Sequence, residues 1–169
     1  MKLNETLTLP LSAQGAAAMY ADPQYPQFRA RTLGATAASS TVEGDPQQGP
    51  FTVRTELTLP TDRVPDMVRK FVGQTVTVRE TQGWSAAESG GARTGTMSIE
   101  VVGTPASMTA DLRLAPTGTR SSTVSIDGDL VAKVPLLGPR LEKAAVPYVS
   151  TVLRAEERSA AAYREAQGN

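Results

Sequence analysis

The C-terminal stretch from Gly138 to Gln167 constrains the fold most, because it carries a long amphipathic helical pattern. Small or apolar residues recur there in steps of three and four, which places them along one side of a helix. They are Leu141, Ala145, Tyr148, Val152, Ala155, Ser159 and Tyr163. A helix from Pro139 to Ala166 would be roughly 42 Å long at about 1.5 Å per residue. Almost everything between Ala35 and Val134 indicates strand and turn, so we expect a curved sheet wrapped around this helix.

The strands are recognised by alternation of polar and apolar residues, the pattern of a half-buried sheet. Clear alternation covers Lys2–Leu9, Phe51–Leu59, Gln74–Gln82, Thr94–Val102, Ser107–Leu114 and Arg120–Val134, with a weaker segment over Ala35–Glu43. Short turns containing glycine or proline join most of these segments. Consecutive strands joined in this way predict an antiparallel sheet.

Short helices are expected outside the sheet. Ser12 is a candidate N-cap for a helix from Ala13 to Tyr20, and a second short helix covers Pro26 to Thr32. A further helical turn is predicted from Pro65 to Phe71. Because helices and strands are segregated along the chain, the fold class is α+β. A length of 169 residues favours a single domain spanning residues 1–169.

Composition narrows the possible functions. The chain has no cysteine and no histidine, which excludes disulfides, thiolate nucleophiles, a serine–histidine triad and the commonest metal ligands. Lys plus Arg equals Asp plus Glu at 17 each, so no broad attraction to nucleic acid is expected. No apolar run is long enough for a membrane span, and the chain begins directly with a strand. We therefore expect a cytoplasmic protein without metal or cofactor.

The junction between the last strand and the long helix carries a family resemblance. Val134-Pro135-Leu136-Leu137-Gly138, together with the Leu9-Pro10 end of the first strand, resembles an actinobacterial family called domain of unknown function 2505. The order of elements is similar to the helix-grip fold of the START-like (SRPBCC) superfamily, which includes Bet v 1-like and polyketide cyclase-like proteins. The resemblance implies a curved antiparallel sheet of six to seven strands, two short helices after the first strand, and a cavity. It implies no catalytic residues.

The residues expected to face the interior predict that the space beneath the helix is not completely filled. Most inward helix positions are small, and aromatic residues make up only 5% of the chain. We therefore predict an apolar cavity for a hydrophobic or lipid-like small molecule between the sheet and the helix. The alternative is that small residues let helix and sheet pack together without a cavity. The candidate lining residues are Val53, Thr55, Val78, Glu80, Met97, Ile99, Met108, Ala110, Leu112, Ile126, Tyr148 and Val152.

Other functions remain open at this point. Glu5 and Glu80 share the apolar phase of their strands, and a buried carboxyl group with a raised pKa can act as an acid or base. Such a group would allow a cyclase-like or hydrolase-like enzyme. Pairing with arginine, or a local bulge, would instead give these glutamates a structural role. A third possibility is a protein-interaction scaffold. Ligand binding without catalysis is the interpretation we carry forward, and the sequence does not indicate the oligomeric state.

Overall fold

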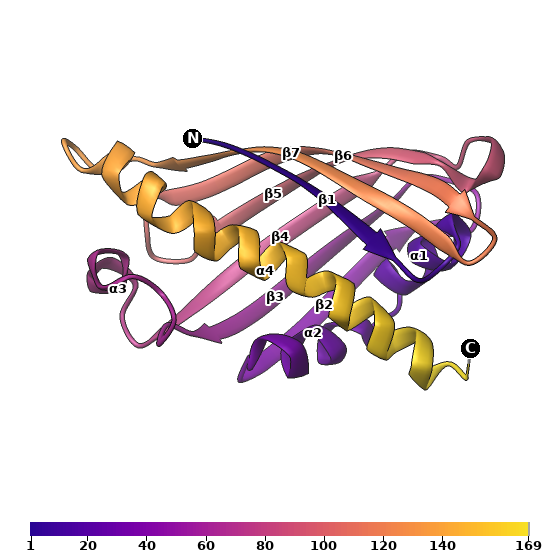
Figure 1. The fold of residues 1–169 in the computed structure, drawn as a ribbon, viewed down its shortest axis with the longest axis horizontal. Helices are drawn as coiled ribbons and strands as arrows, with labels where there is room; N and C mark the ends of the chain where they lie inside the picture. Colours follow the sequence, from indigo (N-terminus) through magenta and orange to yellow (C-terminus); the bar gives the residue numbers. More distant parts are fainter. Residues whose placement is uncertain (169) are drawn as a thin grey trace.

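A computed structural model describes residues 1–168 as one antiparallel sheet of seven strands in the order β1-β7-β6-β5-β4-β3-β2 (Figure 1). Every strand from β2 to β7 pairs with its neighbour in sequence, and β1 pairs with β7. The first strand and the last strand therefore lie side by side. The strands are β1 (Lys2–Leu9), β2 (Ala37–Gly44), β3 (Phe51–Pro60), β4 (Thr75–Trp84), β5 (Arg93–Val101), β6 (Ala106–Gly118) and β7 (Ser121–Ala132).

The α-helices of residues 1–168 occupy the predicted places, and they are α1 (Ala13–Tyr20), α2 (Tyr25–Leu33), α3 (Asp66–Val72) and α4 (Gly138–Ala166). A 3-10 turn, η1 (Ser89–Gly91), was not predicted as a helix. The Ser12 side chain accepts a hydrogen bond from the Gly15 amide at 3.0 Å, as expected of an N-cap. Gly34 ends α2 with a φ of 70°, a conformation that costs glycine little. The α+β helix-grip prediction is thus confirmed. None of the helices within residues 1–168 is long and apolar enough to cross a lipid bilayer.

The long helix α4 lies across the strands on one face of the sheet (Figure 1) and packs against β1, β7, α2 and α3. Its burial is uneven along its length. Leu141 near its start is buried, and so is the segment from Leu153 to Tyr163 at the positions that face inward. Between them, Ala145, Tyr148 and Val152 are only half-buried. The helix is therefore fixed at both ends and less closely packed in the middle.

Two apolar clusters form the core. The larger cluster joins β1, β6 and β7 to α1, and it contains the fully buried Leu7, Met19 and Leu114. A smaller cluster of Leu57, Leu59 and Val76 lies where β3 and β4 approach α3. The space under the middle of α4 lies between these two clusters, and the candidate site is found there.

The larger cluster is expected to supply most of the fold's stability. Leu7 is 0% exposed, so Leu7→Ala should lower the free energy of unfolding by about 2–5 kcal/mol, through lost burial and the void left behind. Thr8 is exposed on the opposite face of β1, and Thr8→Ala should cost less than about 1 kcal/mol. Urea denaturation followed by circular dichroism measures both values. Equal losses would show that β1 does not anchor the core.

Candidate functional site

An apolar cavity of about 150 Å³ lies between the middle of α4, the sheet and α3. Aliphatic side chains supply most of its wall, because β3, β4 and β5 each present their inward-facing alternate residues there. Three valines spaced four residues apart, on α3 and the loop before it, also cover the cavity: Val64, Val68 and Val72. The principal lining residues are Leu57, Leu59, Val64, Val68, Val72, Val76, Val78, Ile99, Val101, Met108, Ala145, Tyr148, Val149, Val152 and Leu153.

The structure divides the sequence-derived candidates into two groups. Half of them lie at the cavity: Val78, Glu80, Ile99, Met108, Tyr148 and Val152. The others are buried but lie away from it: Val53, Thr55, Met97, Ala110, Leu112 and Ile126. Most of this second group belongs to the larger core cluster, together with residues of α1 and α2. Alternation identified the correct face of each strand, but it carries no information on which part of that face is covered by other side chains.

A buried ion pair forms the polar end of the cavity. Arg29 of α2 donates two parallel hydrogen bonds to Glu80 of β4, from Nη1 to Oε1 at 3.0 Å and from Nη2 to Oε2 at 3.1 Å. Both residues are buried and both line the cavity. Burial alone would lower the pKa of Arg29, but the negative charges of Glu80 and Glu156 more than offset it and raise that pKa. A ligand in the cavity would therefore meet a guanidinium held in place.

The ion pair continues along β4 as a row of polar contacts. Gln82 Nε2 donates to Glu80 Oε1 at 3.0 Å, and Trp84 Nε1 donates to Gln82 Oε1 at 3.1 Å. These three residues alternate along one strand, so they all face inward. Their hydrogen bonds satisfy polar groups that burial would otherwise penalise. The Glu80 carboxylate is thus held by two neighbours and has a fixed orientation.

Glu5, the other glutamate considered from the sequence, lies outside the cavity. Its carboxylate accepts hydrogen bonds from the Ser150 hydroxyl and from Arg154 Nη1, the latter at 3.0 Å. Both partners belong to α4, so Glu5 attaches β1 to the helix. For Glu5 and Glu80 alike, the structure therefore shows the pairing with arginine that was one of the two sequence interpretations.

A third glutamate, Glu156 of α4, was missed by the sequence analysis. It is only 7% exposed, and its Oε1 has no hydrogen-bond partner within residues 1–168. Burial raises the pKa of Glu156; the charge of Arg29 opposes this rise, and that of Glu80 adds to it. The sequence did contain a signal. Glu156 follows Val152 by four residues and Tyr148 by eight, which places it on the apolar side of the helix.

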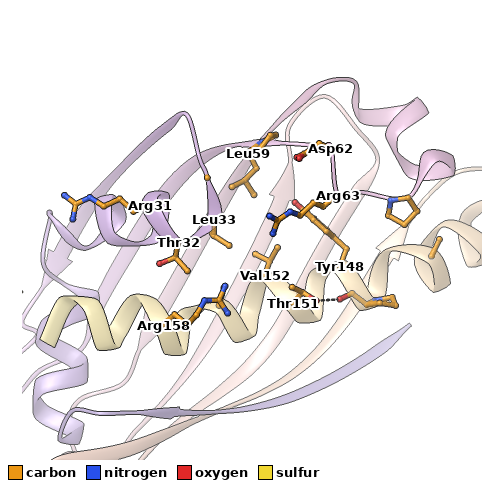
Figure 2. Close-up of a pocket in the computed structure, with 16 residues that line it drawn as sticks. Arg31, Thr32, Leu33, Leu59, Asp62, Arg63, Tyr148, Thr151, Val152 and Arg158 are labelled. Carbon is orange, nitrogen blue, oxygen red and sulfur yellow. Dashed lines mark hydrogen bonds between the residues drawn. The ribbon is translucent and has the colours of Figure 1, made fainter. Parts of the chain in front are cut away.

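A second, larger depression lies on the outer side of α4. This outer groove, of about 680 Å³, is bounded by the end of α2, the end of β3 with the loop that follows, and α4 (Figure 2). Leu59, Tyr148 and Val152 line both the outer groove and the inner cavity, so their side chains form the wall between the two. Burial and the nearby Asp62 raise the pKa of the Tyr148 hydroxyl, and Arg63 opposes that rise.

Comparison with known proteins gives one family and several solved structures. The model of the family described as "Protein of unknown function (DUF2505)" matches residues 4–163. Among curated proteins, none matches the sequence. An aromatase/cyclase from Streptomyces sp. R1128 superposes with a TM-score of 0.62 at 13% identity, over 100% of this chain and 96% of that protein.

Two further solved structures extend the fold comparison. A START superfamily protein from Mycobacterium smegmatis superposes with a TM-score of 0.57 at 14% identity, over 96% of this chain and 98% of that one. Norcoclaurine synthase from Thalictrum flavum superposes with a TM-score of 0.55 at 15% identity, over 100% and 96%. At these identities the likeness establishes a common fold.

Breaking the buried Arg29–Glu80 ion pair is expected to lower the stability of the protein much more than breaking an exposed ion pair. Arg29→Ala leaves the Glu80 carboxylate buried without its cation, which typically costs about 3–5 kcal/mol of unfolding free energy. Arg79, next to Glu80 in sequence, pairs with Glu56 at 3.1 Å on the exposed face of the sheet. Arg79→Ala should cost less than about 1 kcal/mol. Chemical denaturation of both variants provides the test, and a loss for Arg79→Ala as large as that for Arg29→Ala would contradict it.

The raised pKa of Glu156 predicts a specific pH dependence. Because its folded-state pKa lies above the ordinary value of 4.5, the folded protein binds this proton more tightly than the unfolded chain does. Its contribution to stability is therefore greatest below pH 4.5 and is lost as the pH rises through the folded-state pKa. Glu156→Gln removes this dependence, so its stability relative to the natural protein should be higher at pH 7 than at pH 4. Urea midpoints at the two pH values measure the difference. A constant difference would show that Glu156 titrates normally.

Proposed function

Since this chain belongs to the family described as "Protein of unknown function (DUF2505)" and has the START-like helix-grip fold, we propose that it binds a small hydrophobic molecule in the cavity beneath α4. One observation carries the proposal: an aliphatic cavity that ends on the buried Arg29–Glu80 pair. Apolar walls with a few fixed polar groups are typical of small-molecule sites. The walls would provide affinity, and the ion pair would orient a polar group of the ligand.

The volume of the cavity limits what it holds. A dry apolar cavity of about 150 Å³ accommodates a molecule the size of benzene, whereas sites for drug-sized ligands are about 300–1,000 Å³. A single ring or a short branched alkyl group is therefore the part of the ligand that fits under α4. A longer lipid-like tail would need room beyond these walls.

The hydrogen bonding of the cavity carboxylate favours ligand binding over catalysis. The aromatase/cyclase and norcoclaurine synthase share the fold, and at 13% and 15% identity that likeness concerns the fold alone. Glu80 is the carboxylate that lines the cavity, and both its oxygens accept hydrogen bonds from Arg29. Acid–base catalysis requires a group that can reach the substrate and exchange a proton with it. A carboxylate fixed in a two-point ion pair is better suited to positioning a ligand. A scaffold function, in turn, gives no reason for an apolar cavity.

Direct binding of small apolar probes tests the proposal. Benzene and indole should each perturb the NMR signals of methyl groups around the cavity, including those of Val78, Ile99 and Val152, in a saturable manner. Organic extraction of the purified protein followed by mass spectrometry should recover a hydrophobic compound if the natural ligand is retained. If the methyl signals respond to neither probe, the cavity does not bind ligands.

A cavity-filling variant makes the test specific. Ala145 lines the cavity, so Ala145→Leu places three more carbon atoms in the space that the ligand would occupy. Probe affinity should fall by at least about tenfold, corresponding to about 1.4 kcal/mol. Stability should be unchanged or higher, because filling a cavity adds contacts to the folded state. Ala161→Leu, at an exposed position of the same helix, should leave both unchanged. Equal probe affinities in the two variants would place binding elsewhere.

A further inference from the structure

The wall between the inner cavity and the outer groove is thin. Tyr148 and Val152 of α4 and Leu59 of β3 contribute to both spaces. Tyr148 is half-buried, and Figure 2 shows it between α4 and the loop that carries Asp62 and Arg63. Tyr148 has the largest side chain in this wall, and its ring lies in a part of α4 that is less closely packed than the ends.

The two spaces differ in size and in chemistry. The inner cavity of about 150 Å³ holds one apolar group, whereas the outer groove measures about 680 Å³ and includes charged residues in its walls. A ligand larger than one ring can therefore be held only if the rest of it passes the Tyr148 wall. Its apolar end would lie inside, and its other end would lie in the groove.

The charges of the outer groove are predominantly positive. Arg63 and Arg158 project toward the groove from opposite walls, Arg63 from the loop after β3 and Arg158 from α4 (Figure 2). Both are exposed, and neither forms an ion pair with a carboxylate in the part of the chain that the structure describes. Asp62 is the acidic residue in the lining. Arg31 also belongs to the lining, but its side chain extends away in Figure 2 and lies over the ring of Phe28, 5.1 Å from its centre.

Building on the proposed binding function, we infer that the ligand is an amphiphile with a carboxylate group, which lies in the outer groove between Arg63 and Arg158. Its apolar group enters the inner cavity past Tyr148. A guanidinium presents two parallel N–H donors that match the two oxygens of a carboxylate, and Arg63 and Arg158 have no competing carboxylate partner within residues 1–168. The head group thus provides selectivity, and the inner cavity provides the apolar contacts.

A matched set of probes separates the two parts of the site. 4-Phenylbutanoate, 4-phenylbutanol and 4-phenylbutylamine share a phenyl ring and a four-carbon chain and differ in the head group, which at pH 7 is anionic, neutral and cationic in turn. Calorimetry at low ionic strength and pH 7 should show the carboxylate binding about tenfold more tightly than the alcohol, and the amine more weakly than either. The preference should shrink in 0.5 M salt, because the groove is open to solvent.

Substitutions then test whether Arg63 and Arg158 cause the preference for the carboxylate. The double variant Arg63→Ala/Arg158→Ala should bind the carboxylate and the alcohol with equal affinity, while its affinity for the alcohol stays within about twofold of the natural protein. Both positions are exposed, so folding should be preserved. Arg31→Ala, which removes the same charge from a side chain that points away, should keep the tenfold preference.

Other outcomes would overturn either the inference alone or the proposed function as well. Equal binding of carboxylate and alcohol by the natural protein, or a preference for the amine, would overturn the inference and leave the apolar cavity function standing. Loss of the preference in Arg31→Ala but not in the double variant would also overturn it. If none of the three probes binds, and benzene and indole also fail, the proposed function falls together with the inference.

Discussion

The fold depends on the contact of β1 with β7 and α4, which joins the two ends of the chain. β1 pairs with β7 along its whole length, and α4 packs over both strands. The amino terminus adds hydrogen bonds to Asp129 of β7 and to the Leu130 carbonyl oxygen, at 3.0 and 2.6 Å. Without this contact, the amphipathic helix would lose the apolar surface of β1 and β7, and an isolated helix gains little stability from propensity alone.

Uneven anchoring of α4 explains why an apolar cavity occurs where it does. The helix is tightly packed through Leu141 at one end and through Leu153 and Tyr163 at the other. Between these anchors its inward residues are small or only half-buried, and the nearest strands offer aliphatic side chains too short to fill the gap. α3 and the loop before it cover this part of the molecule with three valines rather than with aromatic residues. A cavity persists because the anchors at both ends hold the helix away from the sheet.

Charged residues are also buried inside the protein, although hydrophobic packing does not require them. Two glutamates and one arginine are buried within one region, and only Glu80 is fully paired with Arg29. Burial raises the pKa of Glu156; the charge of Arg29 opposes this rise in part, and the charge of Glu80 adds to it. Buried charges usually cost stability relative to apolar residues of similar size. Arg29 and Glu80 line the cavity and form its polar end.

The sequence by itself determined the elements, their order and the face that each presents, because periods of 2 and 3.6 residues are local properties of the chain. It also contained the sign that Glu156 faces inward. Only the tertiary structure decided how far the inward faces are filled: Val78 and Ile99 line the cavity, whereas Met97 and Ile126 pack into the core near α1 and α2. It alone brought Arg29 to Glu80, 51 residues away, and placed Arg63 opposite Arg158. Such contacts depend on the curvature of the sheet and on side-chain volumes from distant segments, which no local pattern encodes.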